Sequence, residues 1–139
     1  MGYNGLKKSW IFPGQASQFV GMGKDLFDNT DVGKKYYNLA NDILEIDIKD
    51  ISFNGPEEKL KITKYTQPAI FIVSSVISHL LIENGHVPGC VAGHSLGEYS
   101  ALTAAGGISF ETGLELVKIR SNSMDKAGIT NPGTMAAII

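Results

Sequence analysis

The chain has 139 residues, with 12 basic and 14 acidic side chains, a formal net charge of -2 and one cysteine. This length suits one domain with its own core, and the weak, scattered charge argues against nucleic-acid binding. The lone Cys90 excludes an internal disulfide and is typical of a reducing cytoplasm.

The chain carries no pattern of export or membrane insertion. Its first residues lack the basic, apolar and small-residue order of a secretory signal. The longest apolar stretch, residues 68–82, is interrupted by three serines and a histidine. We therefore expect a soluble, cytoplasmic protein with no membrane partner.

The first half of the chain predicts one short strand followed by helices. Residues 9–12 are typical of a strand that ends at Pro13-Gly14, because proline cannot donate to a strand ladder. Apolar side chains at helical spacing predict an amphipathic helix over residues 31–44, with Asp31 as its N-cap. Gly55-Pro56 opens a short, charged helical turn.

A mostly buried helix is expected next, from Pro68 to Asn84-Gly85, because apolar residues surround its axis. A short apolar run at 87–92 predicts a strand, and residues 98–105 predict the helix after it.

The last part of the chain predicts one more helix and one more strand. The helix runs from about Phe110 to Lys126 with Ser109 as its cap, and the strand begins near Thr134. Alternating strands and helices predict a parallel sheet with helices on both faces, where ligands bind at the carboxyl ends of the strands.

The pentapeptide Gly93-His94-Ser95-Leu96-Gly97 lies between a predicted strand and a predicted helix. Its two glycines permit a sharp turn that leaves the serine hydroxyl exposed beside the free N–H groups of the helix. The Leu96 N–H is the natural donor to a tetrahedral oxyanion. Ser95 is therefore the candidate nucleophile for acyl transfer, and a helix N-cap is the alternative explanation.

None of the three histidines is a convincing base for Ser95. His94 adjoins Ser95, so its ring leaves the turn in another direction and at most lines the pocket. His79 lies on the predicted buried helix, and His86 lies in the turn after it. No cluster of residues has metal-ligand spacing and no phosphate loop is present, so we expect neither a metal nor a cofactor.

Several segments together resemble the malonyl-CoA:acyl carrier protein transacylases. They are FPGQASQ at residues 12–18, YTQPA at 65–69, GHSLGEYSAL at 93–102, LVKIR at 116–120 and GTMAAI at 133–138. Members of that family are about twice as long. The resemblance therefore implies that residues 1–139 are the amino-terminal part of the catalytic domain.

The resemblance also implies a fold. It is an α/β, three-layer, parallel-sheet core of the α/β-hydrolase-like acyltransferase type, here without the inserted small subdomain and the downstream catalytic histidine.

The resemblance gives further residues a role. The Gln15 backbone N–H would be the second oxyanion donor, although Ala16 stands where the family commonly has glycine. Arg120 would pair with the malonyl carboxylate, for which a planar fork is better suited than a lysine. Gln67 would face the same pocket. From the residues alone, Gln15 is a polar loop residue, Arg120 a surface arginine, and Gln67 the cap of the helix that Pro68 begins.

The resemblance implies malonyl transfer from coenzyme A to the phosphopantetheine thiol of acyl carrier protein, through a malonyl-serine ester, in fatty acid or polyketide synthesis. Malonyl-CoA and the carrier protein would be the partners. A serine hydrolase of the α/β-hydrolase type and a non-catalytic docking module are the alternatives. Because a base is missing, we expect the 139 residues alone to be inactive.

Overall fold

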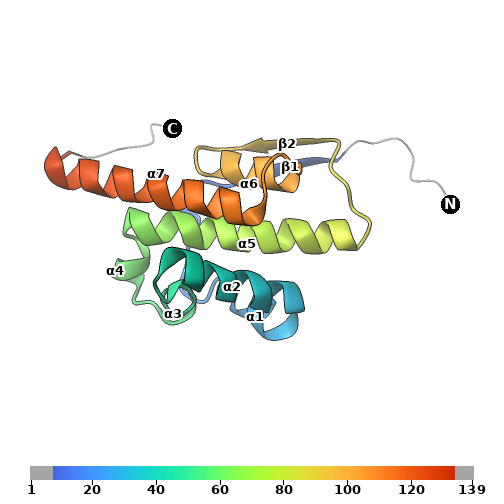
Figure 1. The fold of residues 1–139 in the computed structure, drawn as a ribbon, viewed down its shortest axis with the longest axis horizontal. Coiled ribbons are helices and arrows are strands. Elements are labelled where there is room, and N and C mark those ends of the chain that lie inside the picture. Colours follow the sequence, from blue (N-terminus) through green and yellow to red (C-terminus); the bar gives the residue numbers. More distant parts are fainter. Residues whose placement is uncertain (1–7, 134–139) are drawn as a thin grey trace.

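The computed structural model describes residues 8–133, which form two parallel strands and a set of helices; in Figure 1 the strands lie along the upper edge of the molecule. The elements in chain order are β1 (Ser9–Phe12), α1 (Lys24–Asn29), α2 (Asp31–Leu44), α3 (Ile48–Asn54), α4 (Glu57–Leu60), α5 (Thr63–Glu83), β2 (Cys90–Gly93), α6 (Gly97–Ala104) and α7 (Phe110–Thr130). The strand expected near Thr134 lies outside the described residues. The expected α/β class is confirmed for the described part of the chain.

The two strands place two loops side by side. β1 pairs with β2 in parallel, in a register that joins Ser9 to Cys90 and Phe12 to Gly93. Because parallel strands have their carboxyl ends at one edge, the loop after Phe12 and the turn after Gly93 begin next to each other. The His94 backbone N–H continues the pairing by donating to the Phe12 carbonyl at 3.1 Å.

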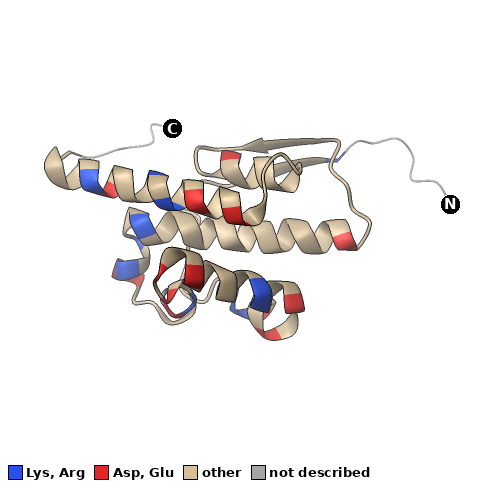
Figure 2. Cartoon of the chain, in the orientation of Figure 1, with Lys and Arg blue, Asp and Glu red and all other residues tan. Residues whose placement is uncertain are grey.

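Helix α5 is the centre of the helical layer, since it contacts α2, α3, α6 and α7. Most of its first half is buried, including Phe71 and Ile72. Among the described helices, α5 alone is long and apolar enough to cross a membrane, and its packing explains that composition as a core helix. Figure 2 shows that its charges lie near its two ends, whereas both signs of charge are interspersed on the helices around it.

One expected helix start is wrong. We expected α5 to begin at Pro68, but it begins at Thr63 and encloses the proline. The N–H groups of Tyr65 and Thr66 both donate to the Ile62 carbonyl, at 2.8 and 2.9 Å, and thereby form a turn before the proline. Burial of the following residues offsets the hydrogen bond that proline cannot make.

Of the N-caps expected for two other helices, α2 and α7, one is wrong and one is confirmed. The bounds expected for α2 agree with the structure, but its N-cap is Thr30 rather than Asp31. Thr30 has extended backbone and its hydroxyl accepts from the Gly33 N–H at 2.9 Å, which places Asp31 in the first turn. The cap at Ser109 is confirmed, because its hydroxyl accepts from the Thr112 N–H at 3.1 Å.

Candidate active site

The backbone around Ser95 forms the expected turn between β2 and α6. Ser95 has a φ of 55°, in the left-handed region that non-glycine residues rarely adopt. A Cβ atom on Gly93 would lie 2.0 Å from the Gly97 carbonyl carbon, and one on Gly97 would lie 2.2 Å from the Phe12 carbonyl oxygen. The strand, the turn and the helix therefore approach too closely for any residue but glycine at both positions.

The loop after β1 lies directly against this turn. A Cβ atom on Gly14 would lie 2.7 Å from the His94 carbonyl oxygen and 2.9 Å from its Nδ1. Ala16 has a φ of 86°, so alanine occupies a position that favours glycine, and its N–H donates to the Gln18 side chain at 2.8 Å. This is the conformation in which alanine is strained, at a cost of about 1–3 kcal/mol.

A chain of side-chain hydrogen bonds links the candidate residues. Arg120, on α7, donates from Nη2 to the Ser95 hydroxyl at 2.8 Å and from Nη1 to the Gln67 Oε1 at 2.6 Å. Gln67, on α5, donates from Nε2 to the Gln15 Oε1 at 3.3 Å, and Gln15 donates to the Thr63 hydroxyl at 3.2 Å. The tertiary fold thus joins the serine turn, α7, α5 and the loop after β1.

The positions of Arg120 and Gln67 differ from those expected of a surface arginine and a helix-capping glutamine. Arg120 is half-buried and directed at Ser95, whereas a surface arginine would extend into solvent. Gln67 is 1% exposed and lies within α5, so it does not cap a helix that begins at Pro68. Both side chains are held at the serine turn.

The positive charge of Arg120 has no carboxylate partner among residues 8–133. Its two hydrogen-bond partners in that part of the chain are neutral, and the centroid of the Tyr99 ring lies 5.9 Å from the guanidinium carbon. A half-buried arginine that contacts only neutral groups favours an incoming anion, because a carboxylate matches its planar fork.

Sequence reasoning missed two residues of this site. The Met124 sulfur accepts from the Gln67 Nε2 at 3.3 Å, and Tyr99 lies beside the guanidinium. Met124 follows Arg120 by four residues on α7, so helical spacing is the signal that could have indicated it.

Two backbone N–H groups are available for an oxyanion. Neither the Leu96 nor the Gln15 nitrogen donates to an acceptor within residues 8–133. Leu96 occupies the N-cap position of α6, where the dipole of the helix favours negative charge. That both donors serve one oxyanion remains a prediction.

No histidine within the described residues is hydrogen-bonded to Ser95. His79 bonds the Tyr36 hydroxyl at 2.8 Å from Nδ1 and lies 3.3 Å from Glu83 at Nε2, so it serves the packing of α2 on α5. His94 lies against the loop after β1.

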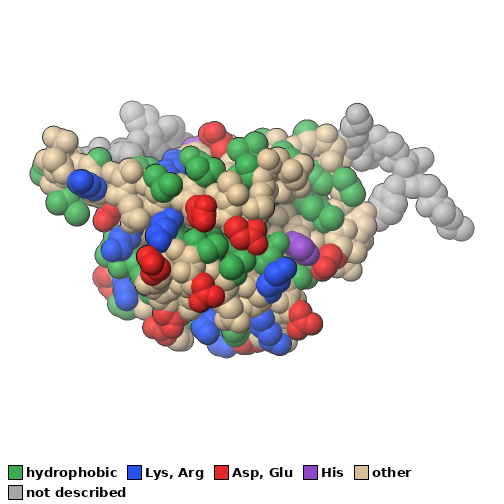
Figure 3. All heavy atoms as spheres, in the orientation of Figure 1, with side chains coloured by type: hydrophobic (Ala, Val, Ile, Leu, Met, Phe, Trp, Pro, Cys, Tyr) green, Lys and Arg blue, Asp and Glu red, His purple; other side chains and the backbone are tan. Residues whose placement is uncertain are grey.

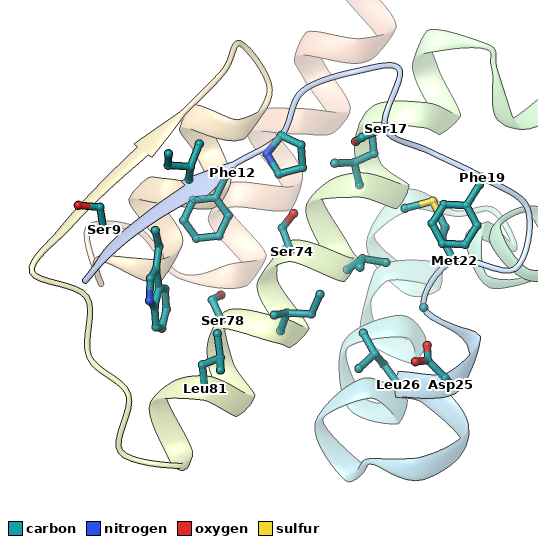
Figure 4. Close-up of a pocket in the computed structure, with 17 residues that line it drawn as sticks. Ser9, Phe12, Ser17, Phe19, Met22, Asp25, Leu26, Ser74, Ser78 and Leu81 are labelled. Atoms are coloured by element: carbon teal, nitrogen blue, oxygen red, sulfur yellow. The ribbon is translucent and has the colours of Figure 1, made fainter. Parts of the chain in front are cut away.

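A cavity among the described residues is separate from the serine turn. A cavity of about 630 Å³ lies between β1, α1 and α5, and Figure 4 shows Phe12, Met22 and Leu26 among the side chains around it. Neither Ser95 nor Arg120 lines it. The candidate site is therefore a surface site at the carboxyl ends of the strands.

A serine held on a sharp turn between a parallel strand and a helix is the arrangement of α/β enzymes that act through a serine nucleophile. Within that class, this chain belongs to the acyl transferase domain family, which it matches over residues 9–139. The family resemblance of the sequence is thereby confirmed.

Several relatives are named malonyl CoA-acyl carrier protein transacylases. The protein of Synechocystis sp. PCC 6803 is 46% identical over 134 residues, which are 96% of this chain and 44% of the relative. That of Bacillus subtilis is 41% identical over 133 residues, which are 96% of this chain and 42% of the relative. This chain thus spans less than half the length of these relatives.

Solved structures agree in fold. The crystal structure of the Synechocystis transacylase has a TM-score of 0.84 and 47% identity, and the match covers 88% of this chain and 41% of that one. A malonyl-transacylase solved in complex with a type II polyketide acyl-carrier protein has a TM-score of 0.82 and 41% identity over 88% of this chain and 40% of that one.

Proposed function

We propose that the full-length protein transfers a malonyl group from coenzyme A to the phosphopantetheine thiol of an acyl carrier protein, in fatty acid or polyketide synthesis in the cytoplasm. The observation that carries the proposal is the 2.8 Å contact between Arg120 and the Ser95 hydroxyl. It is supported by relatives that bear this activity in their names and by a structural neighbour bound to a carrier protein.

The contact matters because of the length of a malonyl group. Its free carboxylate is separated from the thioester carbonyl by a single carbon. A group that holds the carboxylate must therefore lie within a few ångströms of the nucleophile. The Arg120 guanidinium meets this requirement and lacks a carboxylate of its own in the described structure.

The chemistry has two steps. The Ser95 oxygen attacks the thioester carbonyl, a C–O bond forms, and the N–H groups of Leu96 and Gln15 hold the oxyanion. Collapse breaks the C–S bond, and coenzyme A leaves with the proton that the serine gave up. The carrier thiol then attacks the malonyl-serine ester, the C–O bond breaks, and the serine regains a proton.

Two components of this mechanism are not among the site residues described above. By family resemblance, a histidine further along the full-length protein moves the proton, and a small inserted subdomain encloses the pantetheine arm. Residues 9–133 would supply the nucleophile, the oxyanion donors and the carboxylate clamp.

The test is a search for the acyl-enzyme intermediate. Full-length protein is incubated with malonyl-CoA alone, digested and analysed by mass spectrometry. We expect a malonyl adduct on the peptide that contains Ser95. The adduct should disappear when carrier protein is added, and it should not form in Ser95→Ala. Ser17→Ala, which removes a hydroxyl from the facing loop, is the matched control and should retain the adduct.

Each alternative function gives a different result. A hydrolase would lose the adduct to water at the same rate with and without carrier protein. A docking module would form no adduct. Either result would overturn the proposed transfer.

A further inference from the structure

The side chains of Ser95 and Arg120 are in direct contact. The serine hydroxyl accepts a hydrogen bond from the guanidinium, and this is its one side-chain partner within the described residues. Building on the proposed function, we propose that Arg120 caps the nucleophile at rest and that the carboxylate of the substrate removes the cap.

The contact hinders attack in two ways. A hydroxyl oxygen has two lone pairs, and the N–H at 2.8 Å occupies one of them. The guanidinium also stands within the distance of about 3 Å to which an acyl carbon must approach the oxygen. The oxygen of a capped Ser95 is therefore less accessible to a thioester and has less electron density available for attack.

Gln67 makes the cap stable and reversible. Its side chain is 1% exposed and is held by Gln15 and Met124, so the acceptor for the Arg120 Nη1 is fixed. Arg120 can keep this bond while Nη2 exchanges the serine for another acceptor. Gln67 is thus the anchor about which the guanidinium changes partner.

A carboxylate is the acceptor that this exchange requires. A carboxylate carries a full negative charge and can bind the guanidinium fork in two places, so it forms a stronger bond with Arg120 than the neutral Ser95 hydroxyl does. An uncharged acyl group has no carboxylate that could replace Ser95 as the hydrogen-bond acceptor of the arginine. The charge of the substrate thereby frees the nucleophile that will attack it, in addition to holding the substrate in place.

The size of the effect follows from the strength of one charged hydrogen bond. Such a bond corresponds to a ratio of capped to uncapped molecules of roughly 10- to 150-fold. Without a carboxylate, Ser95 would be free in a correspondingly small fraction of molecules. Discrimination against uncharged acyl groups would then arise at the nucleophile as well as in binding.

The test measures the reactivity of Ser95 with a small neutral reagent, so that no malonyl group is involved. Full-length protein reacts with methanesulfonyl fluoride, and the modified Ser95 peptide is quantified against time. We expect Arg120→Met to raise the rate constant about tenfold or more. Sodium formate should raise the rate of the unaltered protein in a saturable way and should leave Arg120→Met unchanged.

Two matched controls separate the cap from general effects of charge. Lys126→Met removes an exposed cation from the same helix and should leave both the rate and the formate response unaltered. Sodium chloride at equal ionic strength should not replace formate. Gln67→Glu, which supplies a carboxylate from the anchor itself, should raise the rate without formate.

The sign of the result decides the proposal. A nearby cation can also favour the serine alkoxide, and a slower reaction in Arg120→Met would show that arginine activates Ser95. That outcome, or an equal rate in the presence and absence of formate, overturns the cap. A malonyl adduct on Ser95 in the same protein would then leave the proposed transfer intact.

Discussion

Two residues in left-handed backbone flank the candidate site. Ser95 has a φ of 55° and Ala16 a φ of 86°, and they lie on the two loops that leave the paired strands. Each such residue costs about 1–3 kcal/mol and is retained where the surrounding structure enforces it. Here the close approach of Gly93 to Gly97 and the bond from Ala16 to Gln18 provide that enforcement.

At the same scale, Arg120→Ala should separate charged from uncharged substrates in the full-length protein. Removing one partner of a buried charge pair costs roughly 3–5 kcal/mol, so malonyl transfer should fall by about 10²- to 10⁴-fold. Transfer of an acetyl group should be spared or increased. Mass analysis of the carrier protein after incubation with malonyl-CoA or acetyl-CoA measures both activities.

Arg120→Lys is the informative companion variant, because it retains the charge and loses the fork. We expect malonyl transfer intermediate between those of Arg120→Ala and the unaltered protein. A small, parallel change in both activities of Arg120→Ala would indicate a surface arginine and would contradict the clamp.

At the scale of elements, the packing of α5 against α7 fixes the distance between Gln67 and Arg120. The two helices approach closely at Gly113, where an added Cβ would lie 2.6 Å from the Phe71 Cζ and 3.0 Å from the Thr103 Oγ1. Phe71 is fully buried and stacks on Phe110, so it has little freedom to move. The close packing of α7 on α5 therefore requires glycine at position 113.

Gly113→Ala should for this reason destabilise the protein by about 1–3 kcal/mol, the cost of overpacking a filled core. Gly128→Ala, in the same helix, is the control, because no atom lies within 4 Å of its Cβ position. It should stabilise by up to about 1 kcal/mol through helix propensity. Urea unfolding of the two variants measures both effects, and equal midpoints would contradict the packing argument.

At the scale of the whole molecule, the described residues leave apolar surface exposed in two regions. Figure 3 shows hydrophobic side chains among charged ones on the visible face, and Ile119 and Ile129 of α7 are 63% and 74% exposed. The second region is the cavity between β1, α1 and α5, whose rim includes Ile11 and Phe19, at 79% and 64% exposed.

The cavity should bind an apolar dye, since it is lined mainly by aliphatic and aromatic side chains. We expect the 139-residue chain to increase the fluorescence of anilinonaphthalene sulfonate. Phe19→Ser combined with Leu81→Ser, two residues of its lining, should reduce the increase severalfold. Ile129→Ser, which removes a similarly exposed residue from α7, should not. An equal reduction by both changes would show that the dye binds elsewhere.

The sequence determined the local features of this protein. The spacing of Gly93 and Gly97 about Ser95 specified a sharp turn, because that requirement concerns only five consecutive residues. The bounds of α2 followed from helical periodicity. The start of α5 did not, since the turn before Pro68 depends on bonds to the Ile62 carbonyl and on burial that no local pattern encodes.

Only the tertiary structure decided which side chains meet at the serine. Arg120 lies 25 residues from Ser95 and 53 from Gln67 in the chain, and helical spacing alone favoured a surface arginine. The contact exists because α7 packs on α5 and α5 packs on α6, which brings three distant segments to the carboxyl ends of the strands. The nucleophile could therefore be read from five adjacent residues, whereas the residues around it depend on how the helices pack.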